Sequence, residues 1–194
     1  MLLNLTVIVV GYILGSIPSA YIMARLRKGT DIRDVGVGNM GAANVFRHIG
    51  LWEGIVVTLA DMAKGAVAIL IAQALDVSQL WLLGAGFSAL IGHNFPIFAG
   101  FRGGKGSATI IGIFLILAPK EMGIVFGIMA IPIFITHNVA FAMCLGFTFI
   151  PLLIWLFGGS AVLIFYSLAI VIFIGVRSLP DAKQAWPKLG KNKI

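Results

Sequence analysis

The residues best suited to chemistry in this sequence are basic and polar side chains set among glycines. One such segment runs from Gly100 to Thr109 and reads Gly-Phe-Arg-Gly-Gly-Lys-Gly-Ser-Ala-Thr. Glycines let consecutive backbone N–H groups approach an anion, and a helix that begins near Ser107 would favour phosphate at its N-terminus. The segment therefore predicts a phosphate site, with Lys105 also a catalytic candidate, made of Arg102, Gly103, Gly104, Lys105, Gly106 and Thr109.

This segment is not a P-loop of the nucleotide-binding kind. In a P-loop the lysine is followed by Ser or Thr and a β-strand precedes the glycines, whereas here Gly106 follows Lys105. The alternative to a phosphate site is a basic interfacial loop that serves only to orient the chain in a membrane.

A second glycine-rich segment runs from Gly36 to Arg47. Asparagine can orient hydroxyl groups or phosphate oxygens, and arginine can bind a phosphate through two parallel N–H groups. The segment predicts a catalytic role for Arg47 and substrate contacts by Gly38, Asn39, Gly41 and Asn44. The alternative is a glycine-rich turn that binds no ligand.

Further polar positions lie in or beside apolar stretches. His93 could act catalytically as a general base, bind a phosphate, or donate a hydrogen bond between packed helices. Asp61 and Lys64 are three residues apart on one helix face, so they could form a structural ion pair near the end of their helix. Charges inside a membrane are otherwise a sign of function. Residues 15–21, Gly-Ser-Ile-Pro-Ser-Ala-Tyr, are expected to shape a helix end.

The elements that hold these residues must be membrane helices. Of the 194 residues, 60% are apolar and 11% are charged, and the mean hydropathy is +1.05. A soluble domain carries about 25% charged residues, so this chain could not cover a water-facing surface. The net charge of +7 fits basic cytoplasmic loops, and no nucleic-acid partner is expected. The single Cys144 gives no disulfide framework, and no metal site is expected.

The apolar runs predict an all-α integral membrane protein with about seven transmembrane helices, forming one polytopic domain over residues 1–194. The first four runs are 2–24, 51–75, 77–98 and 107–118. The last of these is too short, at about 1.5 Å per residue, to cross a bilayer unaided. Residues 122–176 contain no acidic residue, Lys or Arg, and breaks at His137-Asn138 and Gly158-Gly159-Ser160 divide them into three spans. Five or six spans are the alternatives.

The basic residues predict the orientation. With seven spans and the N-terminus outside, all Lys and Arg residues except Lys64 and Lys120 lie on the inner side. Lys120 would lie outside and Lys64 within a span. Cytoplasmic loops are enriched in Lys and Arg, so we expect the C-terminus inside and the polar segments at the cytoplasmic face.

The order of these motifs resembles the acyl-phosphate-dependent glycerol-3-phosphate acyltransferases of bacteria. The first match is Gly-Ser-Ile-Pro-Ser-Ala-Tyr-Ile from Gly15, and the second is the segment from Asp31 to Arg47. The third, Gly-His-Asn-Phe-Pro-Ile-Phe-Ala-Gly-Phe-Arg-Gly-Gly-Lys-Gly from Gly92, is long and specific. The family's Asp-x-x-Lys-Gly is also present, starting at Asp61.

The resemblance implies transfer of a fatty acyl group from acyl phosphate to a hydroxyl of glycerol 3-phosphate, giving lysophosphatidic acid and phosphate. The expected partners are these two substrates and membrane lipids, at the cytoplasmic face of the bacterial inner membrane. No cofactor is expected, because acyl phosphate is already an activated mixed anhydride. A phosphate oxygen of the substrate could serve as the base in place of His93.

Four positions depart from the family's pattern. Val37 and Ala43 stand where the family usually has Ser and Thr, and Ser178 and Asp181 stand where it has His and Asn. The alternatives are therefore a homologue that acts on another acceptor, or a weakly active or inactive one that binds acyl phosphate or lipid as a regulatory protein. A transporter is a further alternative, disfavoured because the polar motifs gather at one face rather than at the midplane.

Overall fold

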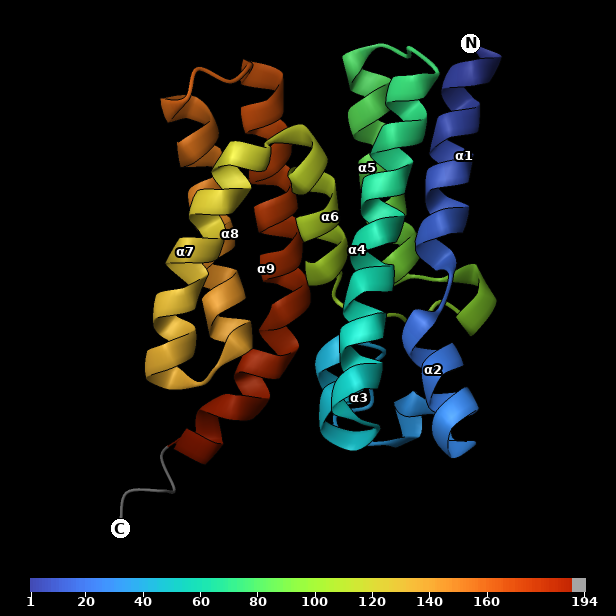
Figure 1. The fold of residues 1–194 in the computed structure, drawn as a ribbon, viewed down its shortest axis with the longest axis vertical. Helices are drawn as coiled ribbons and strands as arrows, with labels where there is room; N and C mark the ends of the chain where they lie inside the picture. The colour runs from blue at the N-terminus through green and yellow to red at the C-terminus, as the bar shows by residue number, and fades with distance from the viewer. Residues whose placement is uncertain (190–194) are drawn as a thin grey trace. The chain divides into compact units, whose positions relative to one another are not determined.

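The computed structural model describes residues 1–189 of the chain, with side chains described as far as residue 178. Within these residues every regular element is helical, which confirms the all-α prediction. The chain divides into two compact units, Met1–Met122 and Gly123–Ile194. The three polar segments, residues 15–21, 36–47 and 100–109, all belong to the first unit, which holds α1 to α6 in Figure 1. A single domain over the whole chain stays a prediction.

Six helical segments are long and apolar enough to cross a membrane. Among the described residues they are Leu2–Lys28, Leu51–Ala74, Gln79–Ala99, Pro119–Thr136, Val139–Leu156 and Ala161–Ser178. A further apolar helix, Ser107–Leu117, is shorter than a full span, as the sequence predicted. The multi-span membrane architecture is confirmed, whereas the count of seven crossings and their orientation stay predictions.

The first span is broken at Pro18. Helix α1 covers Leu2–Ser16 and helix α2 covers Ser19–Lys28. Ile17 between them is extended, with ψ 115°. Proline has no N–H to continue a helix, and it drives the preceding residue out of the helical region. The sequence predicted one continuous helix over residues 2–24, so the break and the extension to Lys28 are corrections.

Helix α5 (Gln79–Asn94) packs on α1 through small residues. Gly11 and Gly15 are four residues apart, the spacing that lets membrane helices approach closely. A Cβ atom added to Gly11 would lie 2.5 Å from the carbonyl oxygen of Ala85, and one on Gly15 would overlap that of Ala89. The two backbones are therefore in direct contact, and α5 has a fixed depth beside the break.

Helix α4 (Leu51–Ala74) makes the same kind of contact with α6 (Ser107–Leu117). A Cβ on Gly65 would overlap the carbonyl oxygen of Thr109. A Cβ on Gly112 would likewise overlap the carbonyl oxygen of Met62. Because α5 and α6 are both held by backbone contacts, the loop that joins them is fixed at each end.

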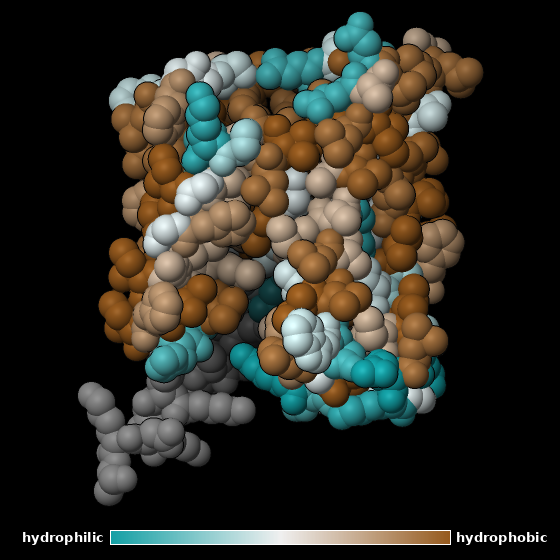
Figure 2. Space-filling model, viewed as in Figure 1, coloured by the Kyte–Doolittle hydropathy of each residue, from teal (hydrophilic) through white to brown (hydrophobic). Residues whose placement is uncertain are grey.

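The connection from α2 to α4 contains a 3-10 helix, η1 (Ile32–Asp34), and the short helix α3 (Ala42–His48). The buried amide of Asn44 holds this connection together. Its Nδ2 donates to the carbonyl oxygens, at 3.1, 2.9 and 3.1 Å, of Ile32, Val35 and Asn39. Figure 2 shows hydrophilic side chains gathered around α2 and α3, below the apolar flanks of the helices.

The second unit holds α8 (Val139–Leu156), α9 (Ala161–Leu189) and most of α7 (Pro119–Thr136). Both predicted breaks are confirmed. His137 has φ +52° and Gly158 has φ +74°, which are left-handed conformations that end a helix.

Candidate functional site

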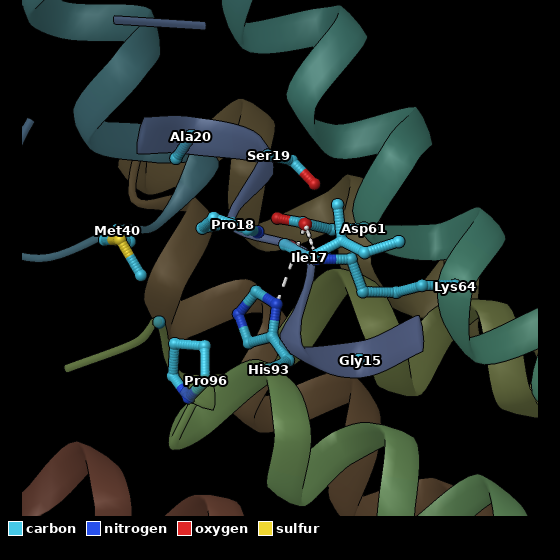
Figure 3. Close-up of a pocket in the computed structure, with 11 residues that line it drawn as sticks. Gly15, Ile17, Pro18, Ser19, Ala20, Met40, Asp61, Lys64, His93 and Pro96 are labelled. Atoms are coloured by element: carbon cyan, nitrogen blue, oxygen red, sulfur yellow. Dashed lines mark hydrogen bonds and ion pairs between the residues drawn. The ribbon is translucent and has the colours of Figure 1, made fainter. Parts of the chain in front are cut away.

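A small cavity in the first unit lies beside the break in the first span (Figure 3). Its volume of about 10 Å³ leaves room for about one water molecule. The lining comes from the break, from α4 and from the end of α5. It also comes from the two polar loops, one between α2 and α4 and the other between α5 and α6. The lining residues are Gly15, Ile17, Pro18, Ser19, Ala20, Met40, Asp61, Lys64, His93, Pro96 and Gly104. The three polar segments that the sequence singled out therefore converge at one place.

Three ionisable side chains meet in this cavity. Lys64 Nζ lies 2.8 Å from Asp61 Oδ1. His93 Nδ1 lies 3.6 Å from the same oxygen (Figure 3), which exceeds ordinary hydrogen-bond length but is close enough for a charge interaction. The side chains are buried, with exposed fractions of 2% for Asp61 and 7% for both Lys64 and His93. The predicted ion pair is confirmed, but it lies near the middle of α4 rather than near its end.

The break in the first span supplies a further partner for Lys64. The Ile17 carbonyl oxygen accepts from Lys64 Nζ at 2.6 Å and from the N–H of Ser19 at 3.0 Å. In a continuous helix this oxygen would accept from an N–H four residues on. Since a buried ammonium is tolerated only when it is paired and hydrogen-bonded, the break helps to hold the charge of Lys64 inside the protein.

The loop between α5 and α6 folds back over the end of α5. The N–H of Gly103 donates to the carbonyl oxygen of Asn94 at 3.1 Å, and the N–H of Gly104 donates to that of His93 at 3.3 Å. The sequence assigned these two N–H groups to an anion, and in this structure they cap α5 instead. A Cβ on Gly104 would overlap His93 Nε2, so the imidazole packs directly on the loop. A role for both glycines in substrate binding stays a prediction.

Helix α6 begins at Ser107, two residues after Lys105, as the sequence predicted. Gly106 has φ +89°, a conformation that glycine adopts without strain. Lys105 is half-buried and lies between Gly104, which lines the cavity, and this helix start. A phosphate at this point would meet the lysine charge and the first-turn N–H groups. Thr109 is buried in the contact with α4, and its Oγ1 has no hydrogen-bond partner within the described residues.

A wider, open hollow of about 490 Å³ is lined by residues of both polar loops. Its lining residues are Asp31, Arg33, Asp34, Gly38, Gly100 and Arg102. Two of the predicted substrate-binding residues, Gly38 and Arg102, are thus brought together from two loops that are far apart in the sequence. The hollow is large enough for a polar substrate, whereas the small cavity beside Pro18 is not.

Arg33 ties the two loops together beside this hollow. Its Nη2 and Nε donate to the Asp31 carboxylate at 2.6 and 3.0 Å. Its Nη1 donates at 2.9 Å to the carbonyl oxygen of Ala99, in the 3-10 helix η2 (Ile97–Ala99). The hydrogen bonds from Arg33 hold the pKa of Asp31 below its ordinary value, and the same bonds raise the pKa of Arg33. The pair therefore stays charged at neutral pH.

The other predicted residues of the second segment have different surroundings. Asn44 is buried and its amide serves the loop, while Asn39 Oδ1 accepts from the N–H of Gly41 at 3.1 Å. Arg47 is exposed on α3. The buried Met40 reaches the cavity, although no sequence pattern pointed to it.

Sequence reasoning missed two features of the site. It treated Asp61 and Lys64 as a separate pair and did not connect them with His93. It also overlooked Asn94, which is fully buried and has no hydrogen-bond partner for either amide atom within the described residues. A polar residue beside His93 in an apolar run was the available signal.

The structure describes the side chains of three of the four positions that depart from the family pattern. Val37 is 63% exposed, and Ala43 is exposed on α3. Ser178 lies in α9, and the side chain of Asp181 is outside the described residues.

Comparison with known proteins identifies the family. The sequence model of the glycerol-3-phosphate acyltransferase family matches residues 5–185. Glycerol-3-phosphate acyltransferase 1 of Dehalococcoides mccartyi is 38% identical, over 91% of this chain and 88% of that protein. The glycerol-3-phosphate acyltransferase of Chlorobium chlorochromatii is 42% identical, over 79% of this chain and 70% of that protein.

Solved structures agree with the sequence comparison. One is PlsY, an integral membrane glycerol 3-phosphate acyltransferase, in its glycerol 3-phosphate form. It superposes with a TM-score of 0.89 at 30% identity, over 95% of this chain and 92% of that one. The lysophosphatidic acid form gives a TM-score of 0.86 at 28% identity, with the same coverage. The chain therefore belongs to the glycerol-3-phosphate acyltransferase family.

Proposed function

We propose that this protein is a membrane enzyme that transfers a fatty acyl group from acyl phosphate to glycerol 3-phosphate, giving lysophosphatidic acid and phosphate. Family membership supports the acyltransferase reaction, and the glycerol 3-phosphate form of the related structure supports that acceptor. The observation that carries the proposal is the convergence of three polar segments on one cavity, beside the glycine loop and Lys105.

The proposed reaction is a direct acyl transfer. The acceptor hydroxyl oxygen attacks the acyl carbonyl carbon, and the bond from that carbon to the phosphate oxygen breaks. The hydroxyl proton passes to His93 or to a phosphate oxygen. Nearby cations stabilise the oxyanion that forms and the phosphate that departs. His93 or a substrate phosphate supplies the base, and the basic side chains supply the cations that this step needs.

The basic residues divide between the two anionic substrates. Lys105, at the start of α6, is placed to bind the phosphate that leaves. Arg102 and Gly38 line the open hollow, where the phosphate of the acceptor would be held beside Arg33. Arg47 and Asn39 would contribute from the same glycine-rich segment, which the buried amide of Asn44 holds in place. These roles use the charge-assisted hydrogen bonds that phosphate favours.

We place the site at the cytoplasmic face of the bacterial inner membrane. The basic loops support this orientation through the positive-inside rule. The acyl chain would enter from the bilayer between helices, while the acceptor arrives from the aqueous side through the open hollow.

The acceptor can be tested with purified protein. Incubation with palmitoyl phosphate and radiolabelled glycerol 3-phosphate should give labelled lysophosphatidic acid. Glycerol in place of glycerol 3-phosphate should react at least about a hundredfold more slowly, because two charge-assisted hydrogen bonds are lost. Equal rates with both acceptors would contradict a phosphate-binding acceptor site.

A further inference from the structure

Residues 95–102 leave the end of α5 and return to it as a closed loop. Where the loop begins, the N–H of Phe95 donates to the carbonyl oxygen of Ile91 at 2.8 Å. Where it ends, the N–H of Gly103 donates to the carbonyl oxygen of Asn94 at 3.1 Å. Both ends of the loop are therefore tied to the last turn of α5.

The loop has an inner and an outer side. On the inner side Pro96 lines the small cavity (Figure 3), and Ala99 is buried in the apolar core. On the outer side the exposed fractions of Ile97, Phe98 and Phe101 are 49%, 59% and 58%. Large apolar side chains that gather on a surface mark a contact with a membrane or with another protein.

The backbone conformation of Phe101 keeps its ring on the outer side. Phe101 has φ +61° and follows Gly100, which has φ +62°. A left-handed backbone is strained for a bulky residue and persists only where the surroundings enforce it. Here the N–H of Phe101 donates to the carbonyl oxygen of Pro96 at 2.9 Å, so the turn itself enforces it.

The backbone of the loop is suited to contact with lipid. The carbonyl oxygen of Phe95 accepts from Tyr12 Oη at 2.9 Å, and that of Ala99 accepts from Arg33 Nη1 at 2.9 Å. In water such groups could bond to solvent, whereas beside lipid an unpaired carbonyl is costly. The apolar span Gln79–Ala99 also runs directly into the loop. Both observations favour a bilayer over an aqueous surface.

We propose that residues 95–102 form a membrane anchor, which inserts Ile97, Phe98 and Phe101 into the hydrocarbon edge of the bilayer. The next residue, Arg102, is exposed and lines the open hollow. Its charge would therefore lie at the level of the lipid phosphates. The hollow would then open where an anionic amphiphile reaches it without leaving the membrane. This inference does not use the proposed reaction, so the two can fail separately.

Spin labelling measures the depth of the loop. Cys144 is the only cysteine in the sequence, so Cys144→Ser gives a background for single labelled cysteines. The loop variants are Phe98→Cys and Phe101→Cys. Leu59→Cys, exposed within the α4 span, is the lipid reference, and Val37→Cys, exposed in the other polar loop, is the aqueous one. Collisions of each label with oxygen and with a nickel chelate would be recorded in phosphatidylglycerol–phosphatidylethanolamine vesicles.

The two reagents separate lipid from water, because hydrocarbon dissolves oxygen and excludes the polar chelate. We expect the oxygen-to-nickel ratio of the loop labels to match the lipid reference and to exceed the aqueous one at least about tenfold. A ratio equal to the aqueous one would overturn the inference. Labels shielded from both reagents would show that a protein surface covers the loop, which overturns it as well. Ile97→Cys replaces either loop variant if that variant does not fold.

A second measurement separates an anchor from a loop that lies in lipid only because α5 ends there. Ile97→Ser and Phe98→Ser would be combined in the Phe101→Cys variant. The oxygen-to-nickel ratio should fall at least about threefold, because burial of apolar area holds the loop at its depth. Val37→Ser is the matched control and should leave the ratio unchanged. An unchanged ratio in the Ile97→Ser and Phe98→Ser combination would overturn the inference.

Discussion

At the scale of single residues, glycines shape the site as much as charges do. Gly104 leaves room for the His93 imidazole, and Gly106 turns the chain into α6 with φ +89°. Between them Lys105 is held at the start of a helix. The position of this lysine therefore depends on two neighbours that have no side chain.

Replacing Lys105 tests the proposed phosphate contact. Lys105→Ala should lower turnover at least about tenfold, because a charge-assisted hydrogen bond of about 1.5–3 kcal/mol is lost. Lys105→Arg should recover only part of this loss, since a planar guanidinium is not a compact point charge. Both variants should keep the melting temperature of the native protein. Full activity in purified Lys105→Ala would show that the loop is only a connector.

Restoring the usual family residues tests the departures in the second segment. Val37 and Ala43 are both exposed, so Val37→Ser and Ala43→Thr meet no steric obstacle in this structure. Steady-state rates with glycerol 3-phosphate should stay unchanged or rise. A sharp loss of rate would mean that this site has been rebuilt for a different acceptor.

Several residue roles could be read from the sequence, and others could not. The sequence has ionisable residues at Asp61, Lys64 and His93 in apolar runs, and these do gather in one cavity. The use of the Gly103 and Gly104 N–H groups to cap α5 was not predictable, because it depends on how the loop folds back. The same is true of the Ile17 carbonyl, which a helix break exposes to a lysine on another helix.

At the scale of elements, close helix contacts fix the depth of the site. α1 meets α5, and α4 meets α6, through glycines that face carbonyl oxygens. The apolar runs predicted the starts of α4 at Leu51 and of α6 at Ser107. The breaks at His137 and Gly158 in the second unit were predicted from polar and glycine residues within a long apolar run. The break at Pro18 was not predicted, because an uninterrupted apolar run conceals a discontinuity that proline imposes.

A single methyl group should disturb the contact between α1 and α5. In Gly11→Ala the new Cβ would lie 2.5 Å from the Ala85 carbonyl oxygen, and overpacking of this kind costs about 1–3 kcal/mol. The melting temperature in detergent should therefore fall. Gly123→Ala is the matched control, because a Cβ there meets no atom within 4 Å. Equal melting temperatures for the two variants would argue against the contact.

Acid should weaken the ion pair that ties the two loops together. The pKa of Asp31 is lowered by its hydrogen bonds to Arg33, so the pair stabilises the fold above the unfolded value of about 3.9. That stability is lost as pH falls through the folded pKa. The drop in melting temperature from pH 7 to pH 3 should be smaller in Asp31→Asn than in the native protein. An identical drop would contradict the assignment, and Asp34→Asn, a change at an exposed neighbour, is the control.

At the scale of the whole molecule, function depends on which face of the membrane the polar loops reach. The basic residues predict seven crossings, with the N-terminus outside and the C-terminus inside. A reporter fused after Ile194 should be active only in the cytoplasm. Activity confined to the periplasm would contradict this topology and would place the proposed site on the wrong side for its substrates.

The choice of acyl donor gives the most direct test of the proposed reaction. Purified native protein would be given radiolabelled glycerol 3-phosphate with equal concentrations of palmitoyl phosphate or palmitoyl coenzyme A, and both labelled product and released phosphate would be measured. We expect lysophosphatidic acid only with palmitoyl phosphate, with one phosphate released for each molecule of lysophosphatidic acid formed. Product from the coenzyme A ester alone, or phosphate release without lysophosphatidic acid, would contradict it.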